Sequence, residues 1–186
     1  MAWGGRRPEQ NYHVRARGQR FAYDFIVLKD GRSHEGDGTS NGDYYCFGEP
    51  VLAPAAGRVT EAVDSVHENT PGEMNREAIF GNHVVIAHGG GEYSVLAHLR
   101  HGSVAVEAGD SVERGRRIGE CGNTGHSSEP HVHYQLQDGP ELGRAAGLPA
   151  PFTDYRADGE HVGLVEPTRG QFVRPEGAER SDREGS

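Results

Sequence analysis

Residues 51–59 read VLAPAAGRV, and residues 106–119 read VEAGDSVERGRRIG. Each run alternates short apolar stretches with glycine, a pattern typical of β-hairpins that turn at glycine corners. Similar short apolar runs continue on both sides, and they predict strands at about residues 21–28, 58–64, 83–88, 93–98, 103–106 and 131–136. The sequence therefore predicts an all-β domain, built as a twisted antiparallel sheet or β-sandwich with few or no helices.

The composition of the 186-residue chain excludes several classes of protein. Lysine and arginine number 19 against 28 aspartates and glutamates, and the net charge of -9 disfavours a protein that grips nucleic-acid phosphates. No window approaches the roughly 20 apolar residues that a membrane-spanning helix needs. The negative charge is compatible with a soluble monomer, which we expect. Cys46 and Cys121 are too few for a disulfide framework, and they allow either one bridge or two free thiols.

The domain organisation follows from where the apolar runs begin and end. We expect a lead-in at residues 1–10, the β domain at residues 11–174, and a disordered charged tail at residues 175–186. The polar segments 30–45 and 65–80 are expected to wall a groove on the sheet. The first residues contain no apolar run typical of a secretory signal. A cell-envelope or extracellular location is expected if a leader is missing, and a cytoplasmic one otherwise.

Residues 131–133 give the strongest local indication of chemistry. They read His131-Val132-His133, and on a strand residues i and i+2 point to the same face. Two converging neutral imidazoles suit a divalent metal, although a surface or core pair is the commoner origin of this pattern. A zinc site needs about three protein ligands, so the others must come from elsewhere in the chain.

The other candidate ligands are His13, Asp24, His88 and His98. Asp24 lies in the otherwise apolar run AYDFIVL of residues 22–28. Because a buried carboxylate without a partner is expensive, we expect Asp24 to face a cation or strong hydrogen-bond donors. An ion pair with an arginine is the simpler alternative. The sequence has no His-Glu-x-x-His motif, which excludes the common helix-borne metallopeptidase site.

The remaining histidines are expected to play no part in such a site. His88 is expected to end a buried strand and to form local hydrogen bonds, with His83 on the opposite face of that strand. The others lie in polar contexts and are expected at the surface: His34, His67, His101, His126 and His161.

Three spaced motifs resemble the lysostaphin/LytM-type zinc metallopeptidases, which cut peptide cross-links in bacterial peptidoglycan. Residues 122–134 read GNTGHSSEPHVHY, similar to the family's glycine-rich turn followed by Pro-His-Leu-His and an aromatic residue. Residues 84–89 and 94–99 read VVIAHG and SVLAHL, similar to its apolar strand ending in His-Gly and its Tyr-x-His-Leu motif. The resemblance runs from about residue 11 to about residue 136, and several motifs in register are far more specific than one.

The resemblance implies a fold of the duplicated hybrid motif type and one zinc ion per chain. It implies Asp24 and His133 as zinc ligands, and His98 and His131 as catalytic histidines that do not bind the metal. The implied activity is hydrolysis of peptide bonds in peptidoglycan stem or cross-bridge peptides by a zinc-activated water.

The first metal ligand departs from the family's pattern. Members usually carry His-x-x-x-Asp, but the residue four before Asp24 is Arg20, which cannot ligate a cation. The nearest upstream histidine is His13, which would reach Asp24 if residues 12–15 and 19–25 paired as adjacent strands. We therefore take His13 as the expected third ligand.

Two other functions stay open at this point. If Arg20 pairs with Asp24 instead, the site holds no metal. The protein is then a catalytically inactive LytM-like scaffold or regulator that binds a cell-wall hydrolase or peptidoglycan. A phosphotransfer protein of the glucose-permease type has a similar glycine-cornered β fold and relays phosphate through a histidine pair. It would require no zinc.

Overall fold

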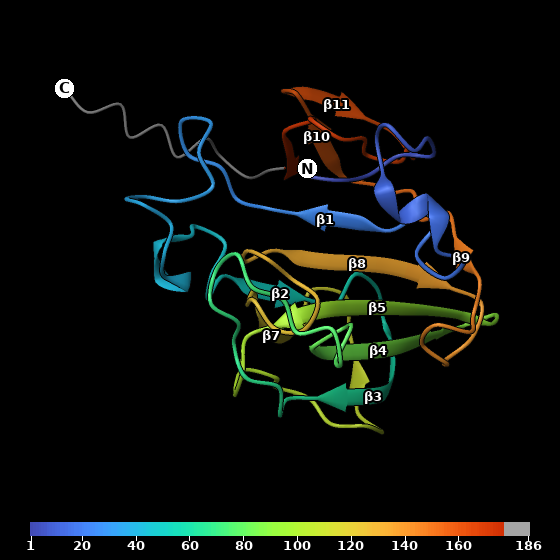
Figure 1. Ribbon diagram of the computed structural model, residues 1–186. Coiled ribbons are helices and arrows are strands. Elements are labelled where there is room, and N and C mark those ends of the chain that lie inside the picture. Colours follow the sequence, from blue (N-terminus) through green and yellow to red (C-terminus); the bar gives the residue numbers. More distant parts are fainter. Residues whose placement is uncertain (177–186) are drawn as a thin grey trace.

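The computed structural model describes residues 1–176, and their architecture is almost entirely β (Figure 1). Within these residues the helical elements are two short 3-10 helices, η1 (Tyr12–Arg15) and η2 (Asn41–Asp43). The strands lie in antiparallel sheets. The prediction of an all-β fold with few or no helices is therefore confirmed.

A seven-stranded sheet forms the body of the protein. Its strands follow the order β1-β8-β5-β4-β3-β6, and β9 pairs with the part of β8 that β1 leaves free. The bounds are β1 (Tyr23–Phe25), β8 (Val132–Gln137), β5 (Glu92–Leu99), β4 (Asn82–Gly89), β3 (Gly57–Val63), β6 (Ser111–Val112) and β9 (Gly147–Leu148).

Two small sheets complete the fold. One pairs β2 (Pro50–Leu52) with β7 (Arg117–Glu120), and the other has the order β11 (Glu160–Val162), β10 (Tyr155–Ala157), β12 (Val173–Pro175). In Figure 1 the second sheet lies beside the N-terminus, on the β1 side of the main sheet. Neither β12 nor its neighbours were predicted, because such short strands carry little sequence pattern.

The strand predicted at residues 103–106 is wrong. This segment is irregular, although Ala105 donates a backbone hydrogen bond to Ile118 (3.0 Å) and Val106 is buried. Its apolar residues pack into the core without forming a ladder, and the next strand along the chain is β6. An apolar run of four residues indicates burial but does not by itself specify strand pairing.

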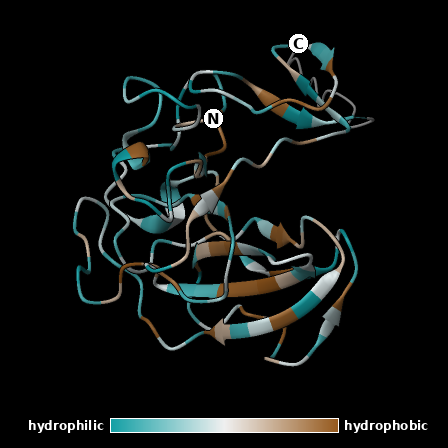
Figure 2. Cartoon of the chain, turned by 90° about the vertical axis from the view of Figure 1, so that its right-hand side faces the viewer, coloured by the Kyte–Doolittle hydropathy of each residue, from teal (hydrophilic) through white to brown (hydrophobic). Residues whose placement is uncertain are grey.

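The register of the main sheet places two distinct sets of side chains on its two faces. Tyr134, Leu96 and Val84 are cross-strand partners, and all three belong to the main hydrophobic core. The opposite face carries the row Asp24, His133, Ala97 and His83 from β1, β8, β5 and β4. The resulting alternation along the strands is visible in Figure 2. A row that is polar except for Ala97 therefore lies on one face of a sheet whose other face is the main core.

Residues 1–10, expected to be a lead-in, support the strand that carries Asp24. The backbone N–H of Ala2 donates to the carbonyl of Asp24 (2.9 Å), and the N–H of Asp24 donates to the carbonyl of Trp3 (2.9 Å). The Met1 amino group donates to the carbonyl of Gln171 (2.9 Å). These contacts fasten the first residues between β1 and the segment that leads into β12.

The predicted tail of residues 175–186 lies largely outside the described residues. Pro175 is the last residue of β12, and the N–H of Glu176 donates to the carbonyl of Asp154 (2.7 Å). Residues 177–186 are not described. Within residues 1–176, no helix is long and apolar enough to cross a membrane.

Two glycines hold the segment 65–80 against the loop that leads into β8. Gly81 and Gly125 both have positive φ angles, of 56° and 77°. A Cβ atom on Gly125 would lie 2.3 Å from the nitrogen of Gly81 and 2.4 Å from the carbonyl oxygen of Ala78. The two backbones therefore approach more closely than any side chain allows.

We expect Gly125→Ala to lower the free energy of unfolding by more than about 3 kcal/mol, because it adds left-handed strain to a backbone collision. Urea denaturation measures this change. Gly163→Ala is the control, since Gly163 has an ordinary φ and a Cβ atom added there would meet no other atom within 4 Å. An equal effect of the two substitutions would contradict the assignment.

Candidate metal centre

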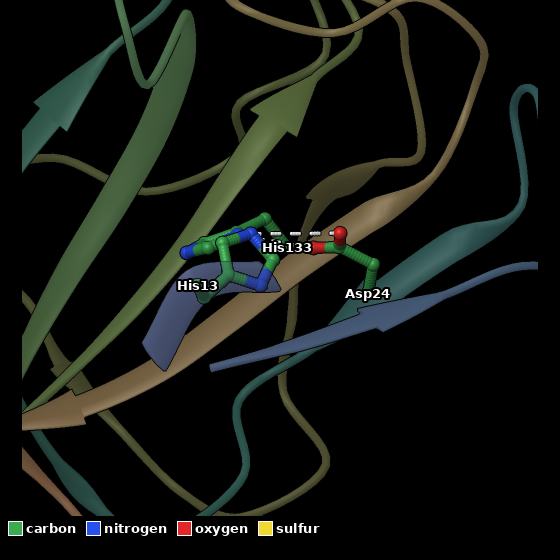
Figure 3. A group of neighbouring side chains, drawn as sticks. All are labelled: His13, Asp24 and His133. Atoms are coloured by element: carbon green, nitrogen blue, oxygen red, sulfur yellow. Dashed lines mark hydrogen bonds and ion pairs between the residues drawn. The ribbon is translucent and has the colours of Figure 1, made fainter. Parts of the chain in front are cut away.

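Four histidines and one aspartate meet on the polar face of the main sheet. Asp24 comes from β1 and His133 from β8, where they are direct cross-strand partners. His98 is near the end of β5, His131 immediately precedes β8, and His13 comes from η1. Figure 3 shows His13 and His133 beside the Asp24 carboxylate. The structure thus brings together every site residue that the sequence singled out.

His13 reaches the site through an element that the sequence did not predict. Residues 12–15, which would have to be a strand to pair with residues 19–25, instead form the 3-10 helix η1. Asn11 caps this helix, and the capped turn points His13 at β1, where its Nε2 lies 3.6 Å from Oδ2 of Asp24. The two residues are therefore adjacent as expected, but the pairing of strands that was to bring them together is wrong.

Asn11 also decides which nitrogen of His13 carries the proton. Its side-chain amide donates to the carbonyls of Gly5 (3.1 Å) and Ala22 (2.9 Å), so its oxygen must face His13. That oxygen lies 2.8 Å from Nδ1 of His13 and accepts the Nδ1–H. Nε2 of a neutral His13 then carries no proton, and its lone pair faces Asp24.

Hydrogen bonding also determines which nitrogen of His133 carries the proton. Its Nε2 lies 3.0 Å from Oε1 of Gln135, and an amide oxygen can only accept, so Nε2 carries the proton. Nδ1 is the other ring nitrogen, and it lies 3.0 Å from Oδ1 of Asp24. When His133 is neutral, the lone pair of its Nδ1 therefore faces Oδ1 of Asp24 at hydrogen-bond distance, and no proton lies between the two atoms.

This arrangement fits a metal ion. Three ligand atoms, one each from His13, Asp24 and His133, lie within 4.8 Å of one another, and all three residues are buried. A tetrahedral metal with ligand bonds of about 2.0–2.1 Å keeps its ligand atoms about 3.3 Å apart. Nε2 of His13 lies 3.6 Å from Oδ2 of Asp24, and Nδ1 of His133 lies 3.0 Å from Oδ1, so each imidazole is near that separation from a different oxygen of the carboxylate.

His98 and His131 face the same space without belonging to this ligand set. Nδ1 of His98 donates to the carbonyl of Thr124 (2.8 Å), and Nδ1 of His131 donates to the carbonyl of Glu129 (2.8 Å). Their rings are 4.7 Å apart, and Nε2 of His131 lies 3.7 Å from Oδ1 of Asp24. Both Nε2 atoms are thus left free to accept or to deliver a proton.

His98 is held in an uncommon backbone conformation. Its φ angle is 63°, in the left-handed region that few residues other than glycine adopt. The carbonyl of Phe80 accepts its N–H (3.1 Å), and its own carbonyl accepts the N–H of Gly122 (3.0 Å). Strain of this kind persists only where the surrounding structure imposes it, and it is common at functional sites.

A cavity of about 260 Å³ opens beside Asp24 and His131. Among its lining residues are Trp3, Tyr12 and Met74. The segment 65–80 therefore contributes a wall through Met74, as predicted. The segment 30–45 contributes no lining residue, and that part of the prediction is wrong. Asn41 instead donates to the carbonyl of Asn69, so this segment supports the wall from behind.

His88 lies outside the site as expected, and the arginine alternative is not observed. His126, expected at the surface, is exposed but lines the cavity beside Asp24. Nδ1 of His88 contacts the carbonyl of Ala56 (2.8 Å), and its Nε2 contacts Oγ of Ser94 (2.7 Å), on the core side of the sheet. Within residues 1–176, the basic side chains within 4.0 Å of the Asp24 carboxylate are histidines, and Arg20 is not among them.

Sequence reasoning did not single out the residues that hold the histidines in place. Asn11 and Gln135 each bind the outward nitrogen of a histidine, and Thr124 does the same through its carbonyl. Gln135 had a recognisable signal, since it continues the alternation of His131 and His133 on one face of a strand.

Comparison with known proteins places the chain in a family. Residues 43–143 match Peptidase family M23. The chain belongs to this family. The match includes His98, His131 and His133, whereas His13 and Asp24 precede it. The resemblance drawn from the sequence motifs is therefore confirmed.

Several M23 relatives can be aligned with the chain. It is 36% identical over 134 residues to an uncharacterized metalloprotease of Haemophilus influenzae, covering 72% of this chain and 24% of that protein. It is 34% identical over 123 residues to lysostaphin of Staphylococcus simulans, covering 66% and 22%. The chain thus spans about a quarter of the length of these relatives.

A solved structure of the same family also aligns. The catalytic domain of lysostaphin from Staphylococcus simulans matches 67% of this chain and 84% of that domain, with 26% identity and a TM-score of 0.42. Membership of a metallopeptidase family implies a metal, and the His13-Asp24-His133 group is the candidate site for it in this M23 domain.

Burial and neighbouring charges set the protonation of the M23 site. Burial lowers the pKa of His13 from 6.5 to about 3, and burial together with His131 lowers the pKa of His98 well below 6.5. His13 and His98 are therefore neutral at neutral pH.

These shifts predict how the stability of the metal-free protein depends on pH. A histidine whose pKa is lowered by folding binds more protons in the unfolded chain, so its contribution is complete above pH 6.5 and is lost as the pH falls. Below pH 6.5, we expect each of His13 and His98 to lower the free energy of unfolding by about 1.4 kcal/mol per pH unit. Urea denaturation in chelator between about pH 7 and about pH 5 measures the slope. His98→Asn should make it shallower, and an unchanged slope would contradict the assignment.

Proposed function

We propose that this M23 domain is a zinc-dependent metalloendopeptidase that hydrolyses a peptide bond in peptidoglycan stem or cross-bridge peptides. The observation that carries the proposal is the convergence of two imidazole lone pairs and one carboxylate on a single buried point. Nitrogen and oxygen ligands of this kind are those that zinc prefers in catalytic sites, where three protein ligands leave a position open.

The residues around the metal ligands supply groups that fit peptide hydrolysis. Zinc bound by His13, Asp24 and His133 would supply Lewis-acid chemistry, which activates water and polarises a peptide carbonyl at neutral pH. His98 is neutral and its Nε2 is free, so this nitrogen is placed to accept a proton from water. Nε2 of His131, next to the Asp24 carboxylate, is placed to hold a proton for the leaving amine.

The substrate class is supported by the relatives and by the shape of the site. Among the relatives are lysostaphin and a protein named peptidoglycan DD-endopeptidase from Vibrio cholerae, the latter 46% identical over 56 residues. The cavity beside Asp24 is open to solvent and is lined by Trp3, Tyr12 and Met74. An extended peptide laid over this face of the sheet would bring one amide to the metal site.

The metal ligands can be tested by elemental analysis of purified protein. We expect about one zinc per chain in the wild type and in the control His88→Ala, since His88 lies on the other face of the sheet. His13→Ala and His133→Ala should each lose the metal. If His133→Ala alone loses it, His13 is not a ligand. Absence of zinc from the reconstituted wild type would rule out the peptidase.

Catalysis can be separated from metal binding through His98. We expect His98→Asn, which suits the left-handed backbone, to keep its zinc and to lose hydrolysis by about 10²- to 10⁴-fold. The measurement is the release of new amino groups from cross-linked muropeptides, followed by mass spectrometry. A zinc-loaded wild type that binds peptidoglycan and cleaves nothing would favour the inactive scaffold instead.

A further inference from the structure

Two glutamines continue the metal-site face of β8 into the interior of the protein. Gln135 and Gln137 alternate with His133, so their side chains share one face of the strand. Both are almost completely buried, with 1% and 0% of their surface exposed. Their direct cross-strand partners on β5 are Val95 and Tyr93. Amides in such surroundings are costly unless they are hydrogen bonded.

The glutamines form one continuous chain of hydrogen bonds that ends at a backbone carbonyl. Nε2 of Gln137 lies 2.6 Å from the carbonyl oxygen of Gly139, and Nε2 of Gln135 lies 2.6 Å from Oε1 of Gln137. Oε1 of Gln135 then lies 3.0 Å from Nε2 of His133. We refer to Gln135 and Gln137 as the glutamine ladder.

The carbonyl of Gly139 fixes the direction of the whole chain. A carbonyl oxygen can only accept, so the amide nitrogen of Gln137 must face it, and the oxygen of Gln137 must face Gln135. That oxygen requires the amide nitrogen of Gln135, whose oxygen in turn faces His133. Starting from Gly139, each acceptor therefore determines which atom of the next residue donates to it. The last donor in this series is Nε2–H of His133.

Reversing the ladder would disable the metal site. If the amide of Gln135 turned, its nitrogen would face Nε2 of His133 and would force the ring proton to Nδ1. Nδ1 is the nitrogen that lies 3.0 Å from Asp24, and a proton there would take the position of the metal. Turning Gln135 would also bring its amide oxygen against the amide oxygen of Gln137. Turning Gln137 as well would bring its oxygen against the carbonyl oxygen of Gly139, and two acceptors cannot form a hydrogen bond.

We propose that Gln135 and Gln137 are positioning residues that keep the proton of His133 on Nε2 and so reserve Nδ1 for the metal. The role in metal binding rests on the function proposed above, whereas the position of the proton does not. Apolar residues of similar size would fill the same space on this face, beside Val95, without the desolvation cost of two amides. Groups that fix a ligand's tautomer typically change metal affinity by about 10- to 100-fold when they are removed.

The first test measures zinc affinity by competition with a chromophoric chelator. We expect Gln135→Met, which keeps the volume and removes the acceptor, to weaken zinc binding by about 10- to 100-fold. Gln137→Met should weaken it less, since Gln135 remains but can turn. Val95→Ala is the control, because it loosens packing opposite Gln135 without touching the ladder. The proposal would be overturned if Gln135→Met bound zinc as tightly as the wild type does. It would also be overturned if Val95→Ala weakened zinc binding as much as Gln135→Met does.

The second test reads the proton directly by ¹H–¹⁵N NMR of the metal-free protein. We expect a proton on Nε2 of His133 in slow exchange with water in the wild type, and in fast exchange in Gln135→Met. A wild-type ring with a bare Nε2 and its proton on Nδ1 would overturn the ladder, whatever the zinc affinity. A wild type that keeps Nε2–H yet binds no zinc would support the ladder and would rule out the proposed function instead.

Discussion

The pairing of Asp24 with His133 across β1 and β8 is the constraint on which the rest of this protein depends. It places the carboxylate of Asp24, a residue with 3% of its surface exposed, in the interior of a small β domain. Such a charge persists only when partners surround it. Here the hydroxyl of Tyr12 donates to Oδ2 (3.5 Å), and nitrogens of three imidazoles lie within 3.7 Å of the carboxylate. The N-terminal segment, the helix η1 and the loop before β8 each contribute contacts that keep those partners in position.

The sequence predicted the parts of the fold whose side chains have one dominant environment. Residues 84–87 and 94–97 are largely apolar because β4 and β5 are central strands, and both strands were located to within a residue or two. The segment 12–15 could not be assigned in the same way. Its conformation is set by the Asn11 cap and by the contact of His13 with Asp24, neither of which leaves a periodic pattern.

The residues of the site also differ in how far the sequence reveals them. His98, His131 and His133 lie in motifs whose spacing is fixed by neighbouring strands, so they can be recognised from the chain alone. His13 and Asp24 come from the part of the chain before the family match, where a short helix replaces the usual ligand spacing. The groups that hold the rings, such as Asn11 and Gln135, act through hydrogen bonds that only the folded chain can form.

The backbone contacts of Ala2 and Trp3 with Asp24 also bear on how a substrate can approach. β1 lies at one end of the main sheet, and in the part of the chain that the structure describes, residues 2–3 occupy its outer edge. Many proteins bind peptides by letting them add a strand to an open sheet edge. Here that edge is closed next to Asp24. The peptide substrate that we propose would therefore come to Asp24 across the face of the sheet, recognised by side chains rather than by pairing with β1.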